Sequence, residues 1–186
     1  NNGSIAIAGN RIRLPKLGWV KFAKSREVEG RIISATIRRN PTGKYFVSVL
    51  VETETELLPA CDSKVGIDLG VKDFAILSTG EAIPNPKYLR KYERKLIRWQ
   101  RKLSRRKKGG ANWYKARIKV ARLHEKVSNC RKDFLHKLST RLIHENQVIC
   151  LWDLQVQNMQ KNHHFAISIA DVSWSTFRTK LEYKAR

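Results

Sequence analysis

Three short apolar segments between residues 65 and 83 limit the fold of this chain more than any other feature of its sequence. They cover residues 65–69, 74–77 and 82–83, and short turns separate them. Short apolar runs bounded by turn residues are typical of β-strands, and strands joined by short turns pair antiparallel. The pattern therefore predicts a three-stranded antiparallel meander, which Pro84 and Pro86 end at the start of a helix.

Two amphipathic segments after the meander predict a helical hairpin. In the first, apolar residues alternate between spacings of three and four: Leu89, Tyr92, Leu96, Trp99 and Leu103. After a break at residues 107–110, the second segment has apolar residues at similar helical spacings: Val120, Leu123, Val127, Cys130, Phe134, Leu138 and Leu142. Two narrow apolar seams joined by a short glycine loop pack as an antiparallel pair. We expect a buried strand at residues 147–151 and a last helix around residues 174–181 to follow.

Residues 4–54 carry a different pattern, in which apolar and polar residues alternate over five short segments. These segments are residues 4–7, 11–14, 19–22, 31–38 and 45–51. Alternation predicts half-buried strands, and we expect a small antiparallel β-barrel or sheet in which most aromatic side chains fill the interior. The alternation of apolar and polar residues stops between Thr53 and Ser63. We therefore place one domain at residues 1–58 and a second, mixed α/β domain at residues 59–186.

The chain is strongly basic, with 38 Lys and Arg against 16 Asp and Glu and a net charge of +22. The hairpin concentrates this charge, because residues 86–145 contain 21 of the basic and 4 of the acidic residues. Such an excess predicts a polyanionic partner, usually nucleic acid, although a solvated basic helix face is the alternative. No apolar run is long enough to span a membrane, and no secretion signal opens the chain, so we expect a cytoplasmic protein.

Twelve residues are candidates for contact with nucleic acid. Trp19 and Lys21 come from the N-terminal strands, and the others are basic residues of the hairpin that would meet phosphates. The hairpin residues are Arg94, Arg98, Arg101, Lys102, Arg105, Arg106, Lys107, Lys108, Lys115 and Arg117. The three cysteines are odd in number and far apart. They predict neither a disulfide framework nor a zinc knuckle.

Asp68 is the first candidate for metal chemistry. Strand alternation places it with Gly66 and Gly70 on the face opposite the apolar side chains. Neighbours without side chains leave room for a divalent cation such as Mg²⁺ and for a phosphodiester. The alternative is a structural role, in which Asp68 caps a turn or pairs with one of the many basic residues.

Five motifs follow one another along the chain: VGIDLGVKDFA at 65–75, QRKLSR at 100–105, RKDFLHKLS at 131–139, DLQVQNM at 153–159 and LEYKA at 181–185. Together they resemble TnpB, the family of RNA-guided DNA nucleases of insertion sequences, also called OrfB-type transposases. The resemblance implies an RNase H-like RuvC domain with an inserted basic hairpin, truncated at its C-terminal end. It also implies that residues 1–58 are part of the family's wedge, a barrel of the oligonucleotide-binding type.

The same resemblance implies that Asp68 is the family's first catalytic aspartate and that Trp152 replaces its catalytic glutamate. An indole has no lone pair for a hard cation, so Trp152 cannot take over that role. Asp153 follows directly, but alternation points it to the other face, and only a bulge or register shift would bring it into the site. Asp68 would then be vestigial, and Mg²⁺ would be a cofactor only in an active nuclease.

These features predict an RNA-guided DNA-binding protein without nuclease activity, a ribonucleoprotein that represses transcription by occupying its target. Its partners would be a guide RNA and double-stranded target DNA. In-line hydrolysis at a two-metal site needs both ions, whereas binding does not. The sequence leaves two alternatives open: an active RNA-guided DNA endonuclease of an insertion sequence, and a decayed transposon remnant that binds RNA non-specifically.

Overall fold

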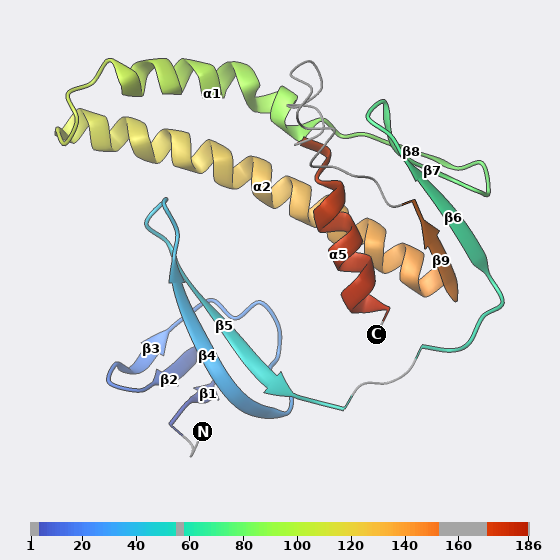
Figure 1. Cartoon of the computed structure of the whole chain (residues 1–186). Helices are drawn as coiled ribbons and strands as arrows, with labels where there is room; N and C mark the ends of the chain where they lie inside the picture. The colour runs from blue at the N-terminus through green and yellow to red at the C-terminus, as the bar shows by residue number, and fades with distance from the viewer. Residues whose placement is uncertain (1–3, 55–57, 153–170, 186) are drawn as a thin grey trace. The chain divides into compact units, whose positions relative to one another are not determined.

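The computed structural model describes residues 4–54, 58–152 and 171–185. The chain divides into two compact units, unit 1 (Asn1–Leu57) and unit 2 (Leu58–Arg186) (Figure 1). The described part of unit 1 contains strands, whereas unit 2 combines helices with a sheet. The mixed α/β architecture is therefore confirmed. Among the described residues, no helix combines the length and apolar character that crossing a membrane requires.

Unit 1 contains five strands in two separate antiparallel sheets. The first sheet has the order β1-β2-β3, and the second pairs β4 with β5. Their bounds are β1 Ala6–Ala8, β2 Arg11–Leu14, β3 Gly18–Lys21, β4 Arg31–Arg39 and β5 Tyr45–Glu52. No strand pairing joins the two sheets in the described part of this unit, so the antiparallel strands are present there as two small sheets and not as a closed barrel.

Aromatic side chains of unit 1 lie on its surface. Trp19 is 50% exposed, Tyr45 67% and Phe46 45%, so the expectation of core packing is wrong for these three. Ile12 and Leu14 are the buried hydrophobic residues in the described part of this unit. Two such side chains make too small an interior to hold a closed barrel together. Lys21 is also exposed, so both candidates on β3 are accessible to a ligand.

Unit 2 is built on a four-stranded sheet with the order β8-β7-β6-β9. The predicted meander forms β6 (Lys64–Leu69), β7 (Asp73–Leu77) and β8 (Ala82–Pro84), which pair antiparallel. β9 (Val148–Leu151) pairs parallel with β6. Parallel pairing brings the C-terminal ends of β6 and β9 to the same edge of the sheet.

Two long helices lie between β8 and β9 in the sequence. α1 (Tyr88–Ser104) and α2 (Ala111–Glu145) run side by side, and α5 (Trp174–Lys184) packs against α2 (Figure 1). The C-terminal half of α2 and α5 cover one face of the sheet. The buried residues that make this core from the helical side include Leu135, Leu138, Leu142, Trp174, Phe177 and Leu181. The sheet contributes Val65, Ile67, Leu69, Phe74, Ala75, Leu77 and Ile83.

Asp171 links three parts of unit 2. Its carboxylate accepts hydrogen bonds from the backbone N–H of Leu89 in the first turn of α1, at 3.1 and 3.2 Å. It also accepts one from Arg131 Nη2 on α2, at 2.6 Å. The residue that precedes α1, Lys87, makes no side-chain capping hydrogen bond. Asp171 therefore satisfies a free N–H of the first turn and places negative charge at the positive end of the helix dipole.

Gly70 is required by the turn between β6 and β7, and this gives a first prediction. A Cβ at this position would lie 2.9 Å from the carbonyl oxygen of Asp73, so Gly70→Ala should lower the free energy of unfolding by about 1–3 kcal/mol. A Cβ at Gly66 would meet Ser78 Cβ at 3.5 Å, an ordinary contact. Gly66→Ala should therefore change stability by less than about 0.5 kcal/mol. Urea unfolding of both variants checks this, and equal losses would contradict it.

Candidate nucleic-acid interface

The face of the unit 2 sheet opposite the helices presents Asp68. Asp68 pairs in register with Ile76 of β7, and both side chains are exposed. Cys150 of β9 is also exposed, whereas the alternate residues Val65 and Ile67 are buried. The alternation expected for β6 is therefore present, and in the described part of unit 2 the core lies on the other side of the sheet.

Trp152 follows β9 at the edge where β6 ends. Ile67 pairs with Leu151, so the next step of this parallel register sets Trp152 beside Asp68, with strands about 4.8 Å apart. Trp152 is 73% exposed. The expected neighbour of Asp68 on the later strand is thus the indole. Asp153 lies outside the described residues.

Asp68 alone does not make a metal centre. Among the described residues, no group of three or more His, Cys, Asp or Glu side chains is arranged to hold a metal ion. A two-metal site for phosphodiester hydrolysis requires several oxygen ligands converging on two ions. The described residues do not fit such a pair, and we assign them no hydrolytic step.

The strongest concentration of charge lies on α1. Its sequence YLRKYERKLIRWQRKLS contains seven basic residues and Glu93 as its one acidic residue. Four arginines recur at spacings of four, three and four, which places them on one face of the helix. We call this face the α1 stripe: Arg94, Arg98, Arg101 and Arg105.

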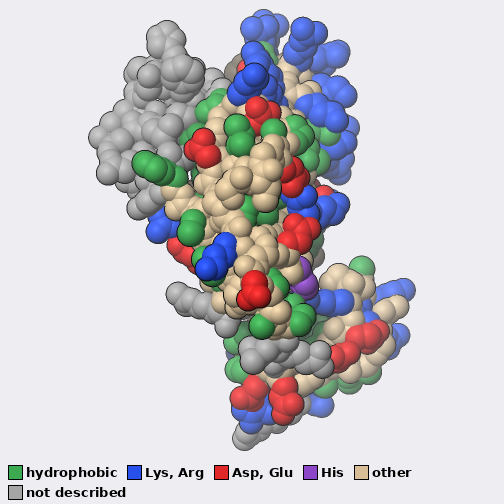
Figure 2. Space-filling view, turned by 90° about the vertical axis from the view of Figure 1, so that its right-hand side faces the viewer, with side chains coloured by type: hydrophobic (Ala, Val, Ile, Leu, Met, Phe, Trp, Pro, Cys, Tyr) green, Lys and Arg blue, Asp and Glu red, His purple; other side chains and the backbone are tan. Residues whose placement is uncertain are grey.

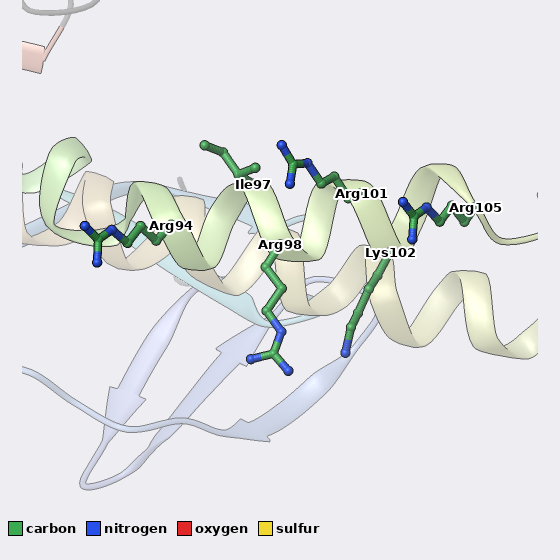
Figure 3. A pocket seen from close by; sticks show the side chains of 6 residues that line it. All are labelled: Arg94, Ile97, Arg98, Arg101, Lys102 and Arg105. Atoms are coloured by element: carbon green, nitrogen blue, oxygen red, sulfur yellow. The ribbon is translucent and has the colours of Figure 1, made fainter.

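An open groove of about 510 Å³ runs along the α1 stripe. Ile97 and Lys102 complete its lining, and five of the six side chains come from α1, while Arg105 is the residue that directly follows the helix (Figure 3). Arg98 and Lys102 extend together to one side of the helix (Figure 3). Blue Lys and Arg side chains also gather at the top of the space-filling view (Figure 2). The groove therefore offers several guanidinium groups, each a planar donor suited to phosphate oxygens.

The α1 stripe should destabilise the protein when no polyanion is bound. Like charges at helical spacings of three and four destabilise a helix by about 0.2–0.5 kcal/mol per pair. Among the described residues that line the groove, none is acidic and could offset the repulsion. A bound polyanion would remove this repulsion.

The remaining hairpin candidates continue from the end of the groove. Arg106, Lys107 and Lys108 lie in the loop between α1 and α2, and Lys115 and Arg117 lie in the first turns of α2. All five are exposed. The aromatic pair Trp113 and Tyr114 beside them was not predicted, although two adjacent aromatic residues shortly after a Gly-Gly break were a usable signal.

A second group of ionisable side chains lies between α2 and α5. Lys180 Nζ is 2.6 Å from His136 Nε2, and Lys184 Nζ donates to the His136 carbonyl oxygen at 3.1 Å and to Ser139 Oγ at 2.8 Å. Partial burial lowers the pKa of His136, and the charges of Lys180 and Lys184 add to this. Burial also lowers the pKa of both lysines. Neutral His136 can accept a hydrogen bond from Lys180 through Nε2, so the cluster holds α5 against α2.

The His136 contact should make stability depend on pH. Because the folded-state pKa lies below the ordinary value of 6.5, the unfolded chain takes up a proton first as pH falls. Stability should therefore decrease as pH drops below about 6.5, by no more than about 1 kcal/mol for so exposed a group. The free energy of unfolding of wild type and of His136→Gln, measured between pH 5 and 8, tests this pH dependence. His124→Gln, on an exposed turn of α2, is the control, and a pH dependence unaffected by His136→Gln would contradict the expectation.

Comparison with known proteins adds the family context. Residues 46–163 match the OrfB_IS605 family, described as a "probable transposase". A Streptomyces pristinaespiralis protein named "Putative RNA-guided DNA endonuclease" is 47% identical over 151 residues, 81% of this chain and 38% of its own length. InsQ of Escherichia coli K12, which bears the same designation, is 36% identical over 192 residues, 94% of this chain and 47% of its own. The chain thus spans less than half the length of these curated relatives.

Proposed function

Because this chain belongs to the OrfB_IS605 transposase family, as its TnpB-like motifs predicted, we propose that it binds a guide RNA and double-stranded DNA selected by that RNA. In such a ribonucleoprotein, base pairing with the guide supplies specificity, and the protein holds the duplex through its backbone. It would act on the DNA of a prokaryotic cytoplasm. The names of the relatives support this proposal for the class of partner.

The observation that carries the proposal is the α1 groove. Its arginines are spaced along a helix, and contacts with successive phosphates of a nucleic acid need such a spacing. The absence of acidic side chains from its lining agrees with a polyanionic ligand. Contacts of this kind bind without reading sequence, which suits a guided protein.

The finer structural assignments belong to the same proposal. The sheet order β8-β7-β6-β9, in which only β9 runs parallel to β6, supports an RNase H-like RuvC domain over residues 59–186. In this assignment α1 and α2 form the inserted basic hairpin. Exposed Trp19 and Lys21 support a nucleic-acid-binding wedge over residues 1–58, although its described strands form two sheets.

The relatives' names favour DNA cleavage over the repressor predicted from the sequence, because both are named as endonucleases. The transcriptional role gains no support from them. One observation favours a second candidate, guided binding without cleavage. Ile67 pairs with Leu151, and continuing this register by one residue would put Trp152 beside Asp68, where a second metal-binding carboxylate would stand.

A cleavage assay decides between the two candidates. The purified protein with its co-purifying RNA is incubated with guide-matched DNA and Mg²⁺, and Asp68→Ala is the matched control. Cleavage that disappears in Asp68→Ala would establish the endonuclease and exclude a nuclease-dead protein. Binding without cleavage, with cleavage gained in Trp152→Glu, would establish the second candidate. Failure to retain any defined RNA species would contradict guided binding itself.

A further inference from the structure

Two aromatic rings and an arginine form a compact cluster at the start of α2. The rings of Trp113 and Tyr114 pack edge to face, with centroids 5.2 Å apart and planes at 82°. The Arg117 guanidinium lies 5.5 Å from the centroid of each ring. Trp113 is half-buried, whereas Tyr114 is 48% exposed. We call these three residues the tip cluster.

The tip cluster lies in strongly basic surroundings. Residues 104–119 contain seven Lys and Arg and no Asp or Glu. The loop between α1 and α2, residues 105–110, lies at the end of the hairpin away from the sheet of unit 2 (Figure 1). A ligand that reaches Tyr114 therefore meets a strongly positive field, which favours an anionic ligand.

Packing within the hairpin does not account for Tyr114. The buried residue in this part of α2 is Ala116, and Tyr114 points away from that side of the helix by its position in the sequence. Its contacts with Trp113 and Arg117 hold the ring before any ligand arrives. A preorganised ring loses little conformational entropy on binding. Proteins that bind single-stranded nucleic acid stack bases on exposed aromatic rings of this kind.

We propose that Tyr114, supported by Trp113 and Arg117, stacks on an unpaired nucleobase of the bound RNA. The inference rests on the proposed function and adds a different contact, since the α1 stripe would bind phosphates and the tip cluster would bind a base. A ring cannot insert beside a base that is paired and stacked within a duplex, so the base must lie in a loop, bulge or end. Folded RNA offers such bases before any target is bound, whereas target DNA is a duplex until it is opened.

The test compares two RNAs bound by the full chain: a stem-loop with 2-aminopurine in the loop, and a blunt duplex of equal length. Tyr114→Ala should weaken stem-loop binding about 5- to 150-fold and abolish fluorescence quenching of the loop base. Duplex binding should change less than about twofold. Tyr114→Phe keeps the ring and should retain both binding and quenching. Tyr183→Ala removes a ring of similar exposure, 51%, from α5 and should change neither.

The outcomes separate this inference from the function on which it rests. Unchanged stem-loop affinity in Tyr114→Ala, or an equal loss with both RNAs, would overturn base stacking. A DNA stem-loop of the same sequence is tested in parallel. Quenching of 2-aminopurine in the DNA loop but not in the RNA loop would overturn the assignment to RNA. If the wild-type chain binds none of these nucleic acids, the proposed function itself is contradicted, and with it the inference that rests on it.

Discussion

Replacing the four arginines of the α1 stripe with glutamine should weaken binding to duplex nucleic acid by roughly 1000-fold at about 0.1 M salt. Each neutralised phosphate contributes about 0.9 to the slope of log affinity against log salt concentration. Four lost contacts should therefore reduce that slope by about 3 to 4. Fluorescence polarisation titrations over a series of salt concentrations measure the affinity and the slope together.

A matched control removes four charges elsewhere in unit 2. The four lysines are exposed and lie outside the groove: Lys64, Lys72, Lys132 and Lys137. Their replacement with glutamine changes the net charge equally, so it should reproduce only the long-range part of the effect, which salt screens. If both quadruple variants lose affinity equally, net charge binds the nucleic acid and the α1 groove is not the site.

Asp171→Asn should destabilise the protein by about 3 kcal/mol. The Asp171 side chain is 9% exposed, and its partner Arg131 is 25% exposed. Removing one member of a buried ion pair costs about 3–5 kcal/mol because the other charge stays buried and unpaired, and the partial exposure of Arg131 places the effect at the lower end. The same change weakens the hydrogen bonds to the first turn of α1. Urea unfolding gives the difference.

The control for Asp171 is an exposed pair on the same helix as Arg131. Asp133 and Lys137 form an ion pair of 2.8 Å, with side chains 62% and 76% exposed. Asp133→Asn should cost less than about 1 kcal/mol. The double variant Asp171→Asn with Arg131→Met should recover part of the stability, because no unpaired charge remains. An Asp171→Asn loss no larger than that of Asp133→Asn would contradict a structural role for this junction.

Features set by local pattern were predictable from the sequence. The strands of the meander and the two hairpin helices follow from residue spacing over short windows, which a single sequence displays. The parallel pairing of β6 with β9 agrees with the expected neighbourhood of these two strands, whereas the position of Trp152 next to Asp68 stays a prediction. The exposure of the basic hairpin residues follows from the seam that turns their helix faces outward.

Features that depend on distant partners were not predictable. Asp171 binds Leu89 and Arg131, which are 82 and 40 residues away, and no local pattern marks it. Alternation predicted the strands of unit 1 but not their division into two sheets, since it shows which face is apolar and not which strands pair. The clearance expected beside Asp68 was partly misread, because Gly70 is needed by its turn and Gly66 could carry a methyl group.

The length of the α1 stripe limits how much of a duplex the protein can follow. From Arg94 to Arg105 the helix rises about 16 Å, at roughly 1.5 Å per residue. Phosphates of one strand advance about 3.4 Å along a B-form axis, so the stripe matches about five consecutive phosphates. That is about half a helical repeat of roughly ten base pairs. The α1 stripe can thus lie along one side of a duplex without encircling it.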